Sequence, residues 1–387
     1  MIANRIFADM PTTVFETMSG LAREHGAINL GQGFPDSQGP EALRRAAAQA
    51  LMTGSNQYAP SRGLPELRAA GAAHYNRLQG TALGPEGVVV TSGATEAIAA
   101  ALMAWISPGD EVVIFEPAYD AYRPLIERAG GVVCAVRLAP PGWRIEQAAI
   151  EAVVTERTRA VVLNNPLNPA ARAFDAAEIE ALAAVCRRHD LIAISDEVWE
   201  HVLFDGRRHH SLLTAPGMAD RTIKIGSAGK MFGMTGWKIG FACGAPALID
   251  PVAKAHQFLT FSSAPNLQAA AAEGLGWETD WFDGMRAEHA AARNRLTAGL
   301  TAEGFAVLPS EATYFLCVDL PASGVTCGDA EFCRRAVTAF GVAAIPLSAF
   351  QTGTVDETIV RLCFAKAHEV LDEAAVRLGR ARRALAG

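Results

Sequence analysis

The sequence predicts an α/β fold, with a large domain built on a mostly parallel sheet that helices cover on both faces, and a smaller α+β domain. Between residues 85 and 245, short apolar runs alternate with amphipathic, helix-like segments. The apolar runs are continuous, which is typical of strands buried on both faces of a parallel sheet. After about residue 280 the pattern changes to one long helix-like stretch followed by further strands.

The expected elements follow from the length and period of each run. Apolar, β-branched runs predict strands of the large sheet at 87–93, 110–119, 131–138, 159–169, 191–197, 222–226 and 239–244. Apolar residues at helical spacing predict helices between them at 94–106, 121–130 and 176–190. Beyond these we expect a helix at 281–304, strands at 313–320, 342–347 and 359–365, and a helix at 370–387.

The change of pattern also suggests domain boundaries. We expect residues 45–284 to form the large domain. Residues 1–44 and 285–387 are expected to form the small domain, with the long helix as the connection.

The composition argues against several classes of protein. The net charge of −7 has no long run of either sign behind it, so we expect no nucleic-acid partner and no membrane surface. The richest apolar run, 96–106, is shorter than the roughly 20 residues of a membrane span. Seven scattered cysteines without metal-ligand spacing predict reduced thiols, a cytoplasmic location and no metal site. His209 and His210 are expected at the surface.

Polar residues gather where the predicted strands end. In a parallel α/β sheet, ligands bind outside the carboxyl ends of the strands. The segments at those ends are Ser92-Gly93, Glu116-Pro117, Asn164 to Asn168, Asp196-Glu197 and Ser227 to Lys230. We therefore expect the functional site at this edge of the sheet.

Three of these segments indicate a chemistry, and each also has a plainer interpretation. The glycine turn at Gly93 opens a helix, whose free N–H groups suit a phosphate, unless the turn is only a tight connection. Asp196 follows a buried strand, so its carboxylate needs a cationic partner, unless it merely caps a helix. Lys230 is one of only five lysines and lies in a glycine-rich loop with Ser227 and Lys238. The plainer interpretation of Lys230 is a solvated side chain at the surface, the usual position of a lysine.

Together these parts fit pyridoxal phosphate. This cofactor needs a lysine amine for its imine, an acid that keeps its ring nitrogen protonated, and a phosphate site. It also needs a hydrogen-bond donor beside its phenolate oxygen and an aromatic wall over its ring. Asn168 and Tyr119 are available for these two positions.

From about residue 10 onward the chain resembles the class I/II aminotransferases of the large pyridoxal-phosphate fold family, the fold type I enzymes. The matching segments are "NLGQGFPD", "NQY", "EPAYDAY", "NNPLNP", "SDEVWEHVLFDG" and "IGSAGKMFGMTGWKIG". They are similar to those of kynurenine–oxoglutarate transaminases, also called glutamine transaminase K or cysteine-S-conjugate β-lyase, and of bacterial methionine aminotransferases. So many matches in order are more specific than any single one.

The resemblance implies how the cofactor is bound. Lys230 would be the catalytic amine that forms the imine, and Asp196 would pair with the ring nitrogen. Asn168 would donate to the phenolate oxygen and Tyr119 would stack on the ring. The phosphate site would consist of the backbone amides of Ala94 and Thr95, the side chains of Ser227 and Lys238, and Tyr58 of the partner subunit.

The resemblance also implies a substrate site shared between two subunits. Arg361 would bind the substrate α-carboxylate with two parallel hydrogen bonds, which a lysine could not supply. The remaining substrate contacts would come from Gly33, Asn168 and Phe15, and from Phe261 of the partner subunit. The protein is therefore expected to be a homodimer.

Several residues depart from the family pattern, among them Ala312, where glycine is common, and the alanine after Asn-Pro in "NPAA", where glycine is usual. Two departures bear on the cofactor and the substrate. Trp199 stands where the family normally has a tyrosine, whose hydroxyl donates to the phenolate oxygen of the cofactor. Ser262 stands where kynurenine transaminases carry a histidine.

The expected function is transfer of the amino group of an amino acid to a 2-oxo acid by a ping-pong mechanism. Neutral or aromatic donors are favoured, because no second arginine can be assigned to a side-chain carboxylate. One alternative is a cysteine-S-conjugate β-lyase on the same scaffold. The other is a regulator that binds the cofactor without turnover, which a spectrum with and without an amino donor would distinguish.

Overall fold

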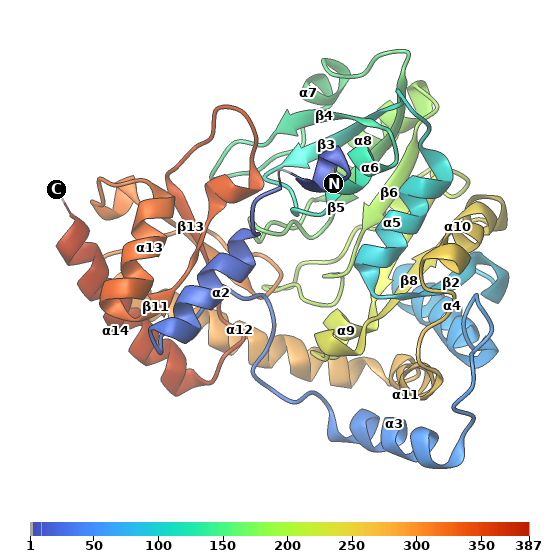
Figure 1. Ribbon diagram of the computed structural model, residues 1–387, viewed down its shortest axis with the longest axis horizontal. Coiled ribbons are helices and arrows are strands. Elements are labelled where there is room, and N and C mark those ends of the chain that lie inside the picture. The colour runs from blue at the N-terminus through green and yellow to red at the C-terminus, as the bar shows by residue number, and fades with distance from the viewer. Residues whose placement is uncertain (1–2, 9, 387) are drawn as a thin grey trace.

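A seven-stranded sheet forms the centre of the larger lobe in the computed structural model, which describes residues 3–8 and 10–386 (Figure 1). Its strands are β2 (Val88–Ser92), β3 (Glu111–Glu116), β4 (Val132–Arg137), β5 (Thr158–Asn164), β6 (Ile192–Asp196), β7 (Thr222–Ser227) and β8 (Ile239–Cys243). They lie in the order β2-β8-β7-β6-β5-β3-β4. Strand β8 is antiparallel to both neighbours and the other paired strands are parallel. The prediction of a mostly parallel sheet is confirmed.

The burial of the strands shows that both faces of this sheet are covered. Every residue of β3, β6, β7 and β8 is buried. Successive side chains of a strand point to opposite faces, so a fully buried strand needs cover on each side. This is the physical reason for the continuous apolar runs in the sequence.

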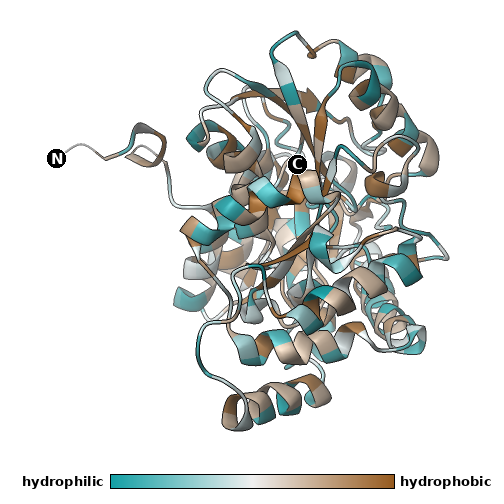
Figure 2. Ribbon diagram, turned by 90° about the vertical axis from the view of Figure 1, so that its right-hand side faces the viewer, coloured by the Kyte–Doolittle hydropathy of each residue, from teal (hydrophilic) through white to brown (hydrophobic). Residues whose placement is uncertain are grey.

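Helices of the larger lobe supply that cover, and further helices lie outside it. The N-terminal part contains α1 (Arg5–Ala8), α2 (Val14–Glu24), α3 (Glu41–Thr53), α4 (Pro65–Gln79), α5 (Ala94–Trp105), α6 (Tyr122–Arg128), α7 (Gln147–Glu151) and α8 (Ala176–Arg188). The later helices are α9 (Ala228–Met231), α10 (Pro246–Leu259), α11 (Pro265–Leu275), α12 (Thr279–Ala302), α13 (Asp329–Phe340) and α14 (His368–Leu385). Many of them show both teal and brown bands in Figure 2, as amphipathic helices do. No helix of the described part is long and apolar enough to cross a membrane.

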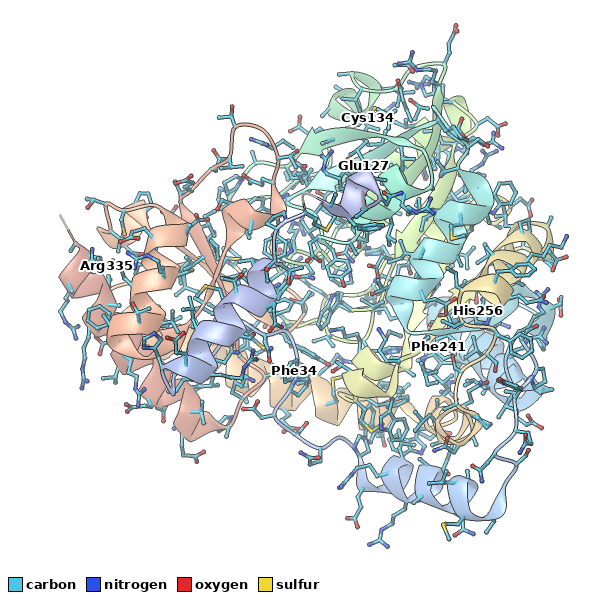
Figure 3. All side chains as sticks on the ribbon, in the orientation of Figure 1. Phe34, Glu127, Cys134, Phe241, His256 and Arg335 are labelled. Atoms are coloured by element: carbon cyan, nitrogen blue, oxygen red, sulfur yellow. The ribbon has the colours of Figure 1, made fainter. Side chains whose placement is uncertain are left out.

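The C-terminal part forms a smaller lobe around two short sheets. One contains β9 (Ala306–Val307), β10 (Phe315–Asp319), β12 (Ile345–Pro346) and β13 (Ile359–Cys363), in the order β12-β13-β10-β9. The other pairs β1 (Ile28–Asn29) with β11 (Val342–Ala343), which joins the N-terminal segment to this lobe. Side chains fill the region between the two lobes, where Phe34 of the N-terminal segment lies (Figure 3).

One predicted strand is divided in the structure. The run 342–347 was expected to be a single strand, but it contains two residues of β11 and two of β12, which belong to different sheets. Ala344 lies between them and is fully buried. A continuous apolar run indicates burial, and burial alone does not show that a run has one pairing partner.

The register of the large sheet brings the polar strand ends together. Asn164 at the end of β5 is paired with Asp196 at the end of β6. Strand β7 runs parallel to β6 and ends at Ser227, directly before α9. The carboxyl ends of three neighbouring strands therefore meet at one edge, as the sequence predicted.

Candidate active site

A cavity of about 200 Å³ opens at this edge of the sheet. The residues that line it are Gly93, Ala94, Thr95, Ile98, Tyr119, Asn164, Asn168, Asp196, Val198, Trp199, Ser227, Lys230, Thr235 and Lys238. Nine of these are residues that the sequence assigned to a cofactor site. They come from segments far apart in the chain, and the sheet brings them together.

Lys230 lies on α9, one turn after the end of β7. Its backbone N–H donates to the Ser227 hydroxyl at 3.3 Å, so Ser227 caps this short helix. Its Nζ atom donates to the carbonyl oxygen of Gly33 at 3.2 Å. It forms no ion pair with a carboxylate of the described residues. Burial lowers the pKa of Lys230 to about 8. An amine with this pKa is partly unprotonated near neutral pH and can act as a nucleophile or base.

Asp196 is buried at the end of β6, with 4% of its surface exposed. The Tyr122 hydroxyl donates to its carboxylate at 2.5 Å, and the Val198 N–H donates at 3.4 Å. Burial raises the pKa of Asp196 to about 6, against the lowering effect of the Tyr122 hydrogen bond. Asp196 forms no ion pair with a described residue, although the charge of Lys230 opposes the rise in the pKa of its carboxyl group. Such a group suits a cationic ligand.

Another part of the cavity lining is suited to an anion. The first N–H groups of α5 have no intrahelical acceptor, and no side chain caps this helix. Gly93 before it has a φ of 78°, and a Cβ atom there would lie 2.9 Å from the Nζ atom of Lys238. The glycine therefore allows the lysine amine to approach the helix N-terminus. Together with the Ser227 hydroxyl, these donors form an anion site.

Arg361 lies on β13 beside the cavity, and 1% of its surface is exposed. Its guanidinium donates to the Asn168 side-chain oxygen at 2.8 Å and to the Gly31 carbonyl at 2.9 Å. The Phe315 ring lies 3.9 Å from it, with Phe15 and Phe350 at 5.2 and 5.3 Å.

This arginine has no carboxylate partner among the described residues, and its Nε atom makes no hydrogen bond. Burial lowers its pKa to about 10, so it keeps its charge. A buried guanidinium that forms no ion pair is suited to bind a carboxylate.

The other predicted site residues divide into two groups. Gly33 and Phe15 lie beside Lys230 and Arg361, and a Cβ atom on Gly33 would lie 2.6 Å from the Phe315 ring. Tyr58 and Phe261 do not line the cavity. Their rings contact each other at 5.2 Å, and they are 83% and 40% exposed.

Three residues near the cavity were assigned no role from the sequence. Tyr122 donates to Asp196, and the Asn164 side chain links the Asp196 carbonyl to the Asn168 N–H. The Tyr314 hydroxyl donates to the Lys230 carbonyl at 2.8 Å. Tyr122 and Asn164 belong to the segments "EPAYDAY" and "NNPLNP", so the signal was present. Tyr314 is brought in from the small lobe, and no local pattern marks it.

A second buried lysine lies outside the cavity. The Lys224 ammonium donates to Glu197 at 2.5 Å and to Glu200, and these carboxylates outweigh burial and raise its pKa. His209 also contacts Glu197, at 2.7 Å, so its predicted surface position is wrong. Ligand atoms of Glu197, Glu200 and His209 lie within 4.8 Å of one another, but the Lys224 ammonium already contacts both carboxylates.

Comparison with known proteins agrees with this geometry. Residues 25–378 match the family described as aminotransferase class I and II. The chain is 45% identical to a probable N-succinyldiaminopimelate aminotransferase of Mycobacterium tuberculosis over 95% of each chain, and 42% identical to the methionine aminotransferase of Escherichia coli, also over 95% of each. It is 33% identical to human kynurenine–oxoglutarate transaminase 1 over 89% of this chain and 90% of that protein. The solved structure of the Mycobacterium tuberculosis N-succinyldiaminopimelate aminotransferase superposes with a TM-score of 0.95 at 44% identity, covering 98% of this chain and 100% of that one.

Proposed function

The chain belongs to the class I and II aminotransferase family, and from this premise we propose that it is a pyridoxal-phosphate-dependent enzyme that uses Lys230 as its catalytic amine. The observation that carries the proposal is the grouping of Lys230, Asp196 and the α5 N-terminus around one cavity of about 200 Å³. An amine, an unpaired acid and an anion site are the groups that this cofactor requires.

The properties of each group support this assignment. The buried Asp196 carboxylate has only hydroxyl and N–H partners among the described residues, so a protonated ring nitrogen would supply the missing positive charge. The donors around Gly93 and Lys238 would hold the phosphate. Tyr119 would form the aromatic wall, because it is half-buried and lines the cavity.

Bound pyridoxal phosphate supplies the electron sink that stabilises negative charge at the substrate α-carbon. The chain's own residues bind the substrate and move the proton. Arg361 orients the amino acid by its α-carboxylate, and Asn168 and Gly31 hold the guanidinium in place. Lys230 removes the α-proton, for which a pKa of about 8 is suitable.

Amino-group transfer is favoured over β-elimination, because the relatives named above are aminotransferases. These relatives are named for different amino donors, so the names do not identify the donor of this chain. We propose neutral or aromatic donors, with a 2-oxo acid as acceptor.

Two further properties complete the proposal. The first is a homodimer in which Tyr58 and Phe261 serve the active site of the partner subunit, since both are exposed and lie outside the cavity. The second is a cytoplasmic location, since all seven cysteines are free thiols. We also propose domain boundaries at residues 44/45 and 284/285.

The test is a spectrum of the purified, cofactor-loaded protein before and after addition of single amino acids without an acceptor. A donor should convert the absorption band of the bound cofactor to that of its amine form, and a 2-oxo acid should restore it. The control variant Arg295→Lys should convert the band as the wild type does, because Arg295 pairs with Asp372 at the surface and takes no part in the site. A protein that binds the cofactor but shows no conversion with any amino acid would support the regulator instead.

A further inference from the structure

A second, larger cavity of about 580 Å³ adjoins the active site. Its walls come from the N-terminal segment, from the loop after β3 and from residues 349–352. Tyr119 lines both cavities, so its side chain forms part of the wall between them. Phe350, which lines the larger cavity, lies 5.3 Å from the Arg361 guanidinium. The larger cavity is therefore next to the proposed carboxylate site.

Some of the charged side chains that line this cavity form ion pairs and one does not. Three charged residues line it: Glu116, Asp120 and Arg123. Arg123 contacts the buried Glu116 at 3.2 Å and donates to Thr352 at 3.0 Å, and Glu116 also contacts Arg137 at 3.5 Å. These charges are satisfied within the wall.

Asp120 has no such partner. Its carboxylate makes no ion pair and accepts no hydrogen bond from another side chain of the described residues, although it is half-buried. Burial raises its pKa, and the positive charge of Arg361 opposes this rise. While no substrate is bound, the positive charge of Arg361 thus stabilises the Asp120 carboxylate. A substrate α-carboxylate on Arg361 would neutralise that charge and leave Asp120 unbalanced.

We propose that the larger cavity receives the side chain of the amino donor, and that Asp120 selects against donors whose side chain ends in a carboxylate. A negative side chain there would face the Asp120 carboxylate, which backbone N–H groups contact but which forms no ion pair with a described residue, in a partly desolvated site. A neutral amide of the same shape would instead donate a hydrogen bond to it, and a cationic side chain would pair with it. The inference rests on the proposed function, since it requires the donor carboxylate to bind Arg361.

The experiment compares donors that differ in charge but hardly in shape. For the wild type and for Asp120→Asn, kcat/KM is measured with glutamine and glutamate, and with asparagine and aspartate. Removing the carboxylate should lower the preference for the amide over the acid by about tenfold, because one unit charge would no longer repel the acid in a partly desolvated site. Glu127→Gln removes a nearby acidic charge that lies outside the cavity lining, and should leave the ratio unchanged.

The ratio separates specificity from damage to the fold, because a structural defect lowers both members of a pair together. An unchanged amide-to-acid ratio in Asp120→Asn would overturn the inference, even if both rates fall. An equal change in Glu127→Gln would also overturn it, because the effect would then be general. The proposed function is tested separately by whether the wild type converts any donor at all.

Discussion

The Nζ atom of Lys230 lies 4.6 Å from the centroid of the Trp199 ring, so the proposed catalytic amine faces an aromatic surface. The Trp199 ring packs in T-shaped contacts with Tyr314 and Phe315, with ring centroids 4.6 and 5.5 Å apart. It is buried, and its indole N–H makes no hydrogen bond with a described residue. The indole ring thus faces the amine at the position for which the family resemblance implies a tyrosine.

The first prediction concerns this position. In Trp199→Tyr, the hydroxyl should donate to the phenolate oxygen of the bound cofactor. Such a bond to a charged acceptor contributes about 1.5–3 kcal/mol, or roughly one to two units of pKa. The unprotonated form benefits more, because in the protonated form the imine N–H already satisfies that oxygen. The absorption band of the unprotonated form should therefore appear at lower pH than in the wild type.

A spectrophotometric pH titration of the loaded enzyme measures this shift, with Trp199→Phe as the variant that has no donor. An unchanged or raised pKa in Trp199→Tyr would mean that the tryptophan serves only for packing.

The second prediction concerns Asp196 in the cofactor-free protein. Its folded-state pKa is raised from 3.8 to about 6, so its contribution favours folding at low pH and is lost as pH rises through about 6. At neutral pH the buried carboxylate opposes folding. Asp196→Asn keeps an acceptor for Tyr122 and should stabilise the cofactor-free protein at neutral pH by about 1–3 kcal/mol.

The same variant should bind the cofactor more weakly, because an amide cannot balance a protonated ring nitrogen. Denaturant unfolding of the cofactor-free protein and a cofactor titration measure the two effects. A variant that is less stable and binds normally would contradict the role of Asp196.

The third prediction concerns Arg361. Arg361→Lys should lower kcat/KM for every amino donor by roughly 10- to 100-fold, since an ammonium cannot make two parallel hydrogen bonds to a carboxylate. The absorption spectrum of the bound cofactor should persist, which shows that the fold and cofactor site are intact. Wild-type kinetics in this variant would remove Arg361 from the substrate site.

The fourth prediction concerns the partner subunit. Chains with Tyr58→Phe and chains with Arg361→Lys should each be impaired alone. Mixed dimers should regain activity, because one of their two sites would combine an intact Arg361 with an intact Tyr58 from the other chain. Failure to recover activity after subunit exchange, or a fully active monomer by sedimentation, would rule out a shared site.

The sequence predicted the large sheet well because burial on both faces leaves a continuous apolar run that is easy to recognise. It also predicted that Lys230 and Asp196 lie at the same edge of this sheet, because Asp196 directly follows an apolar run and Lys230 lies one turn after another. It could not predict that Lys224, three residues from Ser227, lies buried between Glu197 and Glu200. That contact depends on how β7 lies against the turn after β6, and no local pattern records it. The division of 342–347 between two sheets was missed for the same reason.

The structure also explains why these two neighbouring lysines should differ in chemistry. Two carboxylates raise the pKa of Lys224 and keep it charged, whereas burial lowers that of Lys230 to about 8. Of the two, Lys230 has the larger unprotonated fraction near neutral pH, which attack on an aldehyde requires.

Reduction of the cofactor-loaded enzyme with borohydride, followed by mapping of the modified peptide by mass spectrometry, tests whether Lys230 is the amine that binds the cofactor. We expect the reduced cofactor to be attached to Lys230, and Lys230→Ala to fold but carry no covalent label. A label on Lys224, Lys238, Lys254 or Lys366 of the wild-type enzyme would contradict this expectation.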